Sequence, residues 1–211
     1  MGRAVVIGIA GGTASGKSTL ACALATALDA WPAPLRVAVI AMDRYFKRGA
    51  AVPRFFSPSR KEWLPDHNRP DTADLPRLCA DVDALLAAEE HDVIVIEGLM
   101  TLHDDAVRAR CDLKVFVETD DDVRLARRIE RALANDANAT IAGIVGYYFE
   151  SAHRGHHAWV LPSRRHADLI VPGGRDFGPA VEALAAWART RCDLPRTDGA
   201  VAARKSDSRS A

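Results

Sequence analysis

Residues 11–18 read Gly11-Gly12-Thr13-Ala14-Ser15-Gly16-Lys17-Ser18. They follow a short apolar run, Ala4–Ile9, and they precede an alanine- and leucine-rich run that favours a helix over Lys17–Ala30. Strand, glycine-rich turn and helix form the context of a phosphate-binding loop with the spacing G-x-x-x-x-G-K-[ST]. A chance glycine turn is the alternative, but the loop residues and both flanks are in register. The stretch therefore predicts a site for a nucleoside triphosphate with Mg²⁺.

Each residue type in this loop has a physical role. Gly11 and Gly16 let the backbone fold back tightly, so that successive N–H groups point at phosphate oxygens. The following helix begins with unpaired N–H groups and a partial positive charge. Lys17 adds a full charge that reaches the β- and γ-phosphates, and Ser18 offers a hydroxyl ligand to Mg²⁺. We expect the nucleotide to contact this set: Gly11, Gly12, Thr13, Ala14, Ser15, Gly16, Lys17, Ser18 and Thr19.

Length and composition limit the class of protein. A chain of 211 residues with 48% hydrophobic and 27% charged residues is typical of one soluble globular domain. Lysine plus arginine equals aspartate plus glutamate, at 28 residues each, so the net charge does not indicate a polyanionic partner. The apolar runs are shorter than the roughly 20 residues that span a bilayer, and the first is too short for a signal peptide. We therefore expect a cytoplasmic protein without membrane or nucleic-acid partners, and a homo-oligomer stays open.

Strand-like and helix-like runs alternate along the chain. Short runs rich in β-branched residues predict strands at Ala4–Ile9, Leu35–Ala41, Asp92–Gly98, Asp112–Glu118 and Ala167–Pro172. Helices are predicted at Lys17–Ala30, Leu75–Ala88, Asp104–Arg110, Val123–Leu133, Ile141–Trp159 and Pro179–Arg191. The pattern predicts an α/β fold of the P-loop NTPase type, in which helices and a helical lid flank a mostly parallel five-stranded sheet. We expect a single domain over residues 1–192, a lid at about 124–140 and a disordered tail at 193–211.

Residues 48–70 differ from the rest of the chain because they combine four prolines with three large aromatic residues, Phe55, Phe56 and Trp63. This stretch is too irregular for regular structure and too aromatic for a disordered linker. One interpretation is a loop that packs over the substrate, within a substrate loop at about 44–74. The other is an ordered surface loop whose aromatic residues cap the core, and we weigh the two equally.

Two carboxylates are expected at the carboxyl ends of strands, where functional groups gather in open α/β sheets. Asp43 follows the second strand and is expected beside the phosphate site. Glu97 ends the third strand, where four consecutive β-branched residues indicate a central parallel strand buried on both faces. A carboxylate at that position can hold Mg²⁺ directly or through water. The alternative is a glutamate at a strand end that faces solvent.

Two clusters of cationic side chains have competing interpretations. One helix carries four arginines that form either a solvated face or a lid that clamps the transferring phosphoryl group: Arg124, Arg127, Arg128 and Arg131. Four histidines suggest a metal cluster, but they lack paired carboxylates and strict helical spacing, so surface histidines are favoured: His153, His156, His157 and His166.

Several segments together resemble the uridine kinase and phosphoribulokinase family of P-loop kinases. The match covers roughly residues 4–190 and its segments fall in the family's order. The residues that carry it are the loop at 11–18, Asp43-Arg44-Tyr45-Phe46-Lys47, Pro70-Asp71 with Asp74, Ile96-Glu97-Gly98, Asp112–Val117, Thr119-Asp120, Arg124, Arg127-Arg128, Arg131 and 162–172. A P-loop alone would indicate only the superfamily, whereas the ordered set is much more specific.

This resemblance implies a single P-loop kinase domain that uses ATP and Mg²⁺ to phosphorylate a small-molecule hydroxyl, with a nucleoside 5′-hydroxyl as the leading choice. It implies that Asp43 is the catalytic base, with Lys17, Glu97 and two lid arginines beside it in the catalytic site. By the same resemblance, the remaining roles fall on these residues: Arg128 and Arg131 in the lid, Tyr45, Asn68, Asp71 and Arg128 at the acceptor, Asp176 near the nucleotide base, and Ser18 and Glu97 at the metal.

The sequence departs from the family pattern at three places. The extra β-hairpin that contacts pyrimidines in uridine kinases is absent between Asp74 and Asp92, where one helix fills the space. The family's ribose-binding aspartate falls on Asn68, which bonds a hydroxyl without a charge. A second pair of lid arginines falls in Asn135–Thr140, where there is none. Other acceptors therefore stay open, namely nicotinamide riboside, pantothenate or a sugar phosphate, and so does a nucleotide-binding sensor with little transfer activity.

Overall fold

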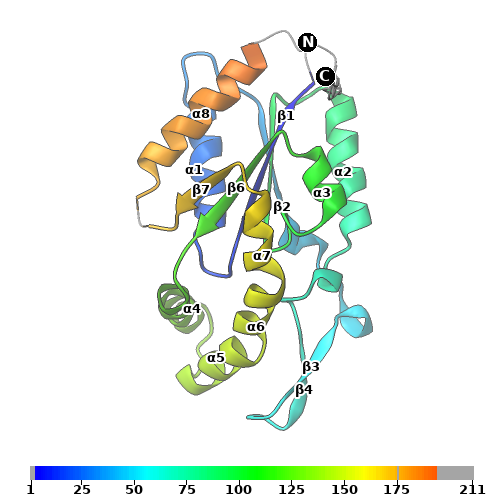
Figure 1. The fold of residues 1–211 in the computed structure, drawn as a ribbon, viewed down its shortest axis with the longest axis vertical. Coiled ribbons are helices and arrows are strands. Elements are labelled where there is room, and N and C mark those ends of the chain that lie inside the picture. The colour runs from blue at the N-terminus through cyan, green and yellow to red at the C-terminus, as the bar shows by residue number, and fades with distance from the viewer. Residues whose placement is uncertain (1–2, 175, 194–211) are drawn as a thin grey trace, which may run out of the picture.

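A computed structural model describes residues 3–174 and 176–193 of the chain. Its central sheet has five parallel strands in the order β2-β5-β1-β6-β7 (Figure 1). The strands are β1 (Val5–Gly11), β2 (Val37–Ala41), β5 (Val93–Gly98), β6 (Leu113–Glu118) and β7 (Leu169–Pro172). The helices are α1 (Lys17–Asp29), α2 (Leu75–Ala88), α3 (Asp105–Arg110), α4 (Asp121–Asn135), α5 (Ile141–Tyr147), α6 (His153–Gly155), α7 (Leu161–Ser163) and α8 (Gly178–Asp193).

This architecture confirms the predicted α/β fold with a parallel five-stranded sheet. The predicted strands all exist, and their ends lie within two residues of the prediction. The predicted lid at about 124–140 overlaps α4, which begins at Asp121. Of the tail predicted at 193–211, Asp193 ends α8 and residues 194–211 lie outside the described residues.

Two layers of helices bury both faces of the sheet, as Figure 1 shows. Val5, Ile7 and Ile9 of β1 pack toward α1 and α8, whereas Val6 packs toward α2 and α3. Successive side chains of a strand point to opposite faces, so a strand covered on both sides needs apolar residues throughout. Every residue of β1 and β5 is buried, which explains their continuous apolar sequences.

The carboxyl ends of the strands point toward the lower part of the molecule in Figure 1, where α4, α5 and α6 lie. The P-loop follows β1 at this edge, and a 3-10 turn, Met42–Tyr45, follows β2. Residues on either side of the predicted substrate loop pair at its base, because Asp74 N–H donates to the Tyr45 carbonyl and Lys47 N–H donates to the Thr72 carbonyl. The two ends of the substrate loop are therefore held next to each other, where residues 45–47 pair with residues 72–74.

The prediction that residues 48–70 lack regular structure is wrong. β3 (Arg54–Ser57) and β4 (Glu62–Pro65) form an antiparallel hairpin, seen at the bottom of Figure 1. Phe56 lies opposite Trp63 across the hairpin, and such aromatic pairs stabilise two strands. Proline is compatible with this hairpin because Pro65 lies at the last position of an edge strand. The Phe56 and Trp63 side chains are exposed, so they do not cap the core.

One helix, α2, fills the space between Asp74 and Asp92, as predicted, and its amino end is capped by the Asp74 carboxylate. The chain from Ile141 to Ser163 is continuously helical and confirms the predicted helix, with π-helical turns at Tyr148–Ala152 and His156–Val160. Such turns shift the helical register and are frequent at functional sites. None of the helices in the described part of the chain has the length and apolar character that crossing a membrane requires.

A matched pair of isoleucine substitutions tests the buried sheet. Ile94 in β5 is fully buried, whereas Ile141 at the start of α5 is 57% exposed. We expect Ile94→Ala to lower the free energy of unfolding by about 2–5 kcal/mol, because it leaves a cavity between the sheet and its helices. Ile141→Ala is the control and should change it by no more than about 0.5 kcal/mol. Urea unfolding measures both values, and equal effects would contradict the core described above.

Candidate active site

The P-loop turns sharply into α1 at Gly16. This residue has φ 98° and caps the helix in the left-handed conformation, which glycine adopts without steric cost. A Cβ atom at Gly16 would also lie 2.8 Å from the Phe177 ring. Among the described residues, no side chain caps the amino end of α1, so its N–H groups stay available for phosphate oxygens. This geometry is the tight turn expected at Gly16, whereas its contact with a phosphate stays a prediction.

Arg124 and His156 pack directly behind the P-loop at Gly12. A Cβ atom there would lie 2.6 Å from Nη1 of Arg124 and 2.9 Å from Nδ1 of His156. Neither of those nitrogens has a hydrogen-bond partner among the described residues. Burial and the nearby Arg124 charge lower the pKa of His156 to about 3, so its imidazole is neutral at physiological pH.

These positions correct two predictions. Arg124 does not belong to an exposed basic face, because its side chain is fully buried. It donates hydrogen bonds to the Thr119 carbonyl and to the Asp121 carboxylate, which compensate the buried charge. His156 is likewise not a surface histidine. Both residues hold the loop from behind, since only glycine at position 12 leaves space for them.

A buried carboxylate lies beside the P-loop, at the end of β5. Ser18 Oγ donates to Glu97 Oε1 at 3.1 Å, while Glu97 Oε2 is buried and has no partner among the described residues. Burial raises the pKa of Glu97, against the opposing effects of the Lys17 charge and the Ser18 hydrogen bond. The alternative of a solvent-facing glutamate is wrong, because this residue is only 7% exposed. A free carboxylate oxygen next to a serine hydroxyl suits a hard cation such as Mg²⁺.

The arginines of α4 reach over the P-loop. Arg128 Nη1 donates to Thr13 Oγ1 at 3.2 Å, and Arg131 Nη2 lies 3.5 Å from the same oxygen. Burial lowers the pKa of Arg128, with a further contribution from Arg131, but a guanidinium stays charged at any physiological pH. The two positive charges therefore meet above the loop that is expected to bind phosphates.

Two cavities meet at Lys17, Ser18 and Arg131. The first is lined by Ala14, Gly16, Lys17, Ser18, Thr19, Arg127, Arg131, Gly174 and Phe177. The second is lined by Thr13, Lys17, Ser18, Asp43, Phe46, His67, Asn68, Leu99, Arg128, Arg131 and Tyr147. The first contains mainly P-loop residues and the second contains the predicted base, so the pair has the layout of a nucleotide site and an acceptor site. We call them the nucleotide cavity and the acceptor cavity.

Aromatic side chains form one wall of the acceptor cavity. The rings of Phe46 and His67 stack with centroids 5.3 Å apart and an interplanar angle of 13°. Tyr147 lies under the Arg128 guanidinium, 5.2 Å from its central carbon, and donates a hydrogen bond to the Pro65 carbonyl of the hairpin. The cavity thus joins flat apolar surface to a charged end at the P-loop.

Asn68 lines the acceptor cavity and is held in a buried polar network. Its amide nitrogen donates to Ser151 Oγ at 2.8 Å and to the Tyr147 hydroxyl at 3.3 Å. Asp66, which is also buried, accepts from Ser151 Oγ and from the Asn68 backbone N–H. The network fixes Asn68 relative to the helical segment that carries Ser151, so its orientation is set before any acceptor binds.

Three residues assigned by resemblance are not among the described residues that line the two cavities. The Tyr45 hydroxyl donates to Asp81 on α2, and Tyr45 does not line either cavity among the described residues. Asp71 forms an exposed ion pair with Arg69, and the hydrogen bond from Arg69 lowers the pKa of the Asp71 carboxyl group. Asp176 accepts from the Gly178 N–H beyond the edge of the nucleotide cavity, next to the lining residue Phe177.

The prediction assigned no individual role to Phe46, His67 or Tyr147, which line the acceptor cavity, and it named Arg127 only within the group of four arginines whose interpretation stayed open. A sequence signal existed for the first of them. Residues three apart eclipse each other in a 3-10 turn, so Phe46 rather than Tyr45 shares the side of Asp43. Nothing in the sequence brings Tyr147 to the acceptor cavity, because that contact depends on how the helical segment packs.

Comparison with known proteins gives a consistent set of relatives. A family model described as the phosphoribulokinase/uridine kinase family matches residues 71–177. A uridine kinase of Clostridium botulinum (strain 657, type Ba4) is 33% identical over 204 residues, which cover 88% of this chain and 96% of that protein. Uridine-cytidine kinase B of Dictyostelium discoideum is 28% identical over 196 residues, which cover 85% of this chain and 79% of that protein.

A solved structure of a candidate fructose transport system kinase from Silicibacter sp. TM1040 is similar in fold. It superposes with a TM-score of 0.59 at 25% sequence identity, and the match covers 82% of this chain and 91% of that chain. Sequence and structure comparisons therefore extend over most of the length described above.

The raised pKa of Glu97 predicts a change in stability with pH. A buried acid with a raised pKa binds its proton more tightly in the folded state, so its contribution to stability is full below the unfolded pKa and is lost as pH rises through the folded pKa. We expect Glu97→Gln, which cannot ionise, to unfold at a higher temperature than the native chain at neutral pH without nucleotide or metal. The difference should vanish under acidic conditions.

The control for this prediction is Glu130→Gln, on the exposed face of α4. Thermal unfolding of the three proteins from about pH 4 to about pH 8 spans the range in which glutamate titrates. A Glu97→Gln variant that is less stable than the native chain at neutral pH would contradict the assignment of a destabilised buried charge.

Proposed function

The chain belongs to the phosphoribulokinase/uridine kinase family and is an ATP-dependent phosphotransferase that acts on a hydroxyl, and we propose that this hydroxyl is the 5′-hydroxyl of a nucleoside. The observation that carries the proposal is the acceptor cavity, in which Asp43 and Lys17 lie with Arg128 and the stacked Phe46 and His67 rings. A nucleoside combines an aromatic base with a hydroxyl, and this cavity combines an aromatic wall with a carboxylate.

In the proposed reaction, Asp43 accepts the proton of the acceptor hydroxyl as its oxygen attacks the γ-phosphorus of ATP. The new O–P bond forms while the bond to the β-phosphate oxygen breaks, and ADP leaves. Lys17, Arg128 and Arg131 stabilise the charge that spreads over the oxygens of the transferring group. Because all of these side chains come from rigid elements around one cavity, positioning supplies much of the rate enhancement.

We further propose that Ser18 and Glu97 hold Mg²⁺. The support is the unpartnered buried oxygen of Glu97 beside the Ser18 hydroxyl, a donor set that fits a small hard cation. When bound, Mg²⁺ supplies positive charge that neutralises the β- and γ-phosphate oxygens. Lys17 lines both cavities together with Ser18, so its charge would act on the same phosphates.

The choice of a nucleoside rests on the aromatic wall together with the relatives named as uridine and uridine-cytidine kinases. The pyrimidine-binding hairpin of the family is replaced here by α2, so base recognition falls to other residues. We assign it to Phe46 and His67, because a flat ring stacks on either face of every nucleobase. The buried Asn68 in the same cavity is the candidate hydrogen-bonding group for the sugar.

Replacing the proposed base separates catalysis from nucleotide binding. We expect Asp43→Asn to lower turnover roughly 10²–10⁴-fold, because the amide cannot accept the hydroxyl proton, while ATP affinity stays near normal. Asp29→Asn, an exposed change at the end of α1, is the control and should leave both values unchanged. Steady-state kinetics and ATP titration give the two values, and near-normal turnover in Asp43→Asn would show that another group is the base.

ADP release from Mg-ATP in the presence of different acceptors tests the substrate class. The panel contains uridine, cytidine, adenosine, nicotinamide riboside, pantothenate, ribulose 5-phosphate and fructose, the last because of the name of the Silicibacter relative. We expect a nucleoside to stimulate release most strongly. Stimulation by a sugar or sugar phosphate alone would replace the nucleoside assignment, and ATP binding without stimulation by any compound would favour a sensor.

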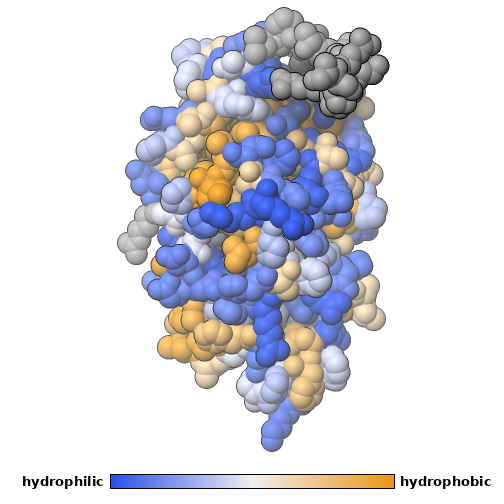
Figure 2. Space-filling view, viewed as in Figure 1, coloured by the Kyte–Doolittle hydropathy of each residue, from blue (hydrophilic) through white to orange (hydrophobic). Residues whose placement is uncertain are grey.

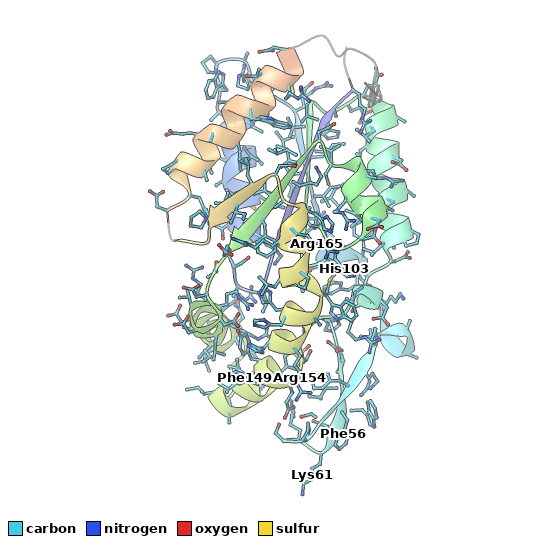
Figure 3. All side chains as sticks on the ribbon, in the orientation of Figure 1. Phe56, Lys61, His103, Phe149, Arg154 and Arg165 are labelled. Carbon is cyan, nitrogen blue, oxygen red and sulfur yellow. The ribbon has the colours of Figure 1, made fainter. Side chains whose placement is uncertain are left out.

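With the stimulating nucleoside in hand, Phe46→Ala should raise its KM about 5- to 150-fold, because stacking of a base on an aromatic ring contributes ~1–3 kcal/mol. The KM for ATP should not change. Phe56→Ala is the matched control, since Phe56 is exposed on the hairpin and points away from the molecule in Figure 3. Equal effects of the two substitutions would remove Phe46 from base recognition.

A further inference from the structure

Three side chains outside both cavities converge on one point between α4 and the helical segment that follows α5. Asp121 is the first residue of α4, and His153 and His157 are four residues apart on the helical segment. Residues four apart lie on the same face of a helix, so both imidazoles point toward Asp121. Phe149 and Arg154, labelled in Figure 3, mark this part of the segment.

Both histidine side chains lie close to the same oxygen of the Asp121 carboxylate. Nε2 of His157 lies 2.7 Å and Nε2 of His153 lies 3.1 Å from Asp121 Oδ2. The two imidazole rings have centroids 4.4 Å apart, and the three ligand atoms lie within 4.8 Å of one another. Ligands at about 2.0–2.2 Å from a tetrahedral Zn²⁺ are roughly 3.3 Å from each other. The two Nε2–Oδ2 distances, 3.1 and 2.7 Å, are therefore already close to the separation that two zinc ligands require.

We propose that Asp121, His153 and His157 form a binding site for Zn²⁺. Two imidazoles and one carboxylate are the donor set of zinc sites with three protein ligands and an open fourth position. The side chains are 35–45% exposed, so solvent reaches that fourth position. Nitrogen donors favour Zn²⁺ over Mg²⁺, which prefers oxygen ligands, and this separates the site from the proposed metal position at Ser18 and Glu97.

The surroundings hold the carboxylate in place. Arg124, fully buried, donates to the other oxygen of Asp121, which leaves Oδ2 directed at the histidines. Burial would raise the pKa of Asp121, but the His157 and Arg124 hydrogen bonds outweigh it and lower the pKa to about 2, so the carboxylate is ionised at neutral pH. Such outer partners orient metal ligands in proteins.

The position of the site links two elements of the enzyme. Asp121 is the first residue of α4, the helix that carries Arg128 and Arg131. The two histidines belong to the helical segment that continues directly from the end of α5 at Tyr147. Bound Zn²⁺ would fasten the start of the lid helix to that segment. None of the three residues lines the nucleotide or acceptor cavity, so the proposal stands whether or not the acceptor is a nucleoside.

Calorimetric titration of the full chain with Zn²⁺, without nucleotide, tests the proposal. We expect one equivalent to bind to the native protein, and His153→Ala or His157→Ala to weaken binding by at least tenfold, since even the loss of an outer partner costs about 10–100-fold. His166→Ala is the matched control, because His166 lies outside the cluster, and it should bind like the native chain. Mg²⁺ in large excess should not compete.

A second measurement keeps the test independent of folding. Zn²⁺ should raise the unfolding temperature of the native chain and of His166→Ala, but not that of His153→Ala/His157→Ala, and a chelator should reverse the increase. Circular dichroism without metal shows whether each variant is folded. Zinc affinity or stabilisation that is equal in the native chain and the double variant would overturn the proposal and leave only the hydrogen bonds between Asp121 and the histidines.

Discussion

Parallel strands end at the same edge of a sheet, and this constraint assembles the candidate active site. The end of β1 leads into the loop that carries Lys17, the end of β2 leads to Asp43, and Glu97 lies at the carboxyl end of β5. β6 leads into α4 at the same edge. Residues that are far apart in sequence thus become neighbours because the strands are parallel and in register. The apolar interior of the sheet, buried on both faces, keeps that edge rigid.

The guanidinium charge of Arg124 lies at this edge and is shielded from water. Arg124 is buried behind Gly12, and its compensation comes from the Thr119 carbonyl and the Asp121 carboxylate. A buried charge that loses its partner is strongly destabilising, so these groups act as a unit. Because Arg124 belongs to α4 and packs against the P-loop at Gly12, the position of α4 and the shape of that loop depend on each other. Exposed apolar side chains gather over β7 and α5 in Figure 2.

Local patterns predicted the parts of the structure that depend on neighbouring residues. Alternation of apolar runs and helix-prone runs predicted the α/β sheet, and the Gly16-Lys17-Ser18 stretch predicted the turn into α1. Packing decided the rest. Arg124 looked like one more arginine of an exposed helix face, and its burial is set by Gly12, more than a hundred positions away in sequence. The hairpin was missed because its prolines resemble loop residues, although they occupy the turn and an edge position where no ladder hydrogen bond is needed. Contacts such as Tyr147 with the acceptor cavity have no local signal at all.

Tyr147 contacts both the hairpin and Arg128 of α4, and this contact constrains how such enzymes diversify. Its hydroxyl donates to the Pro65 carbonyl, its ring meets Phe55 edge-on, and the same ring supports the Arg128 guanidinium. A hairpin of different length or sequence would move Tyr147, and with it an arginine that is proposed to stabilise the transferring phosphoryl group. Choice of acceptor and speed of transfer are therefore not separate traits in this scaffold. A lineage that acquires a new substrate by altering the hairpin must also restore the support beneath Arg128, so we expect changes in the two regions to arise together among diverging descendants.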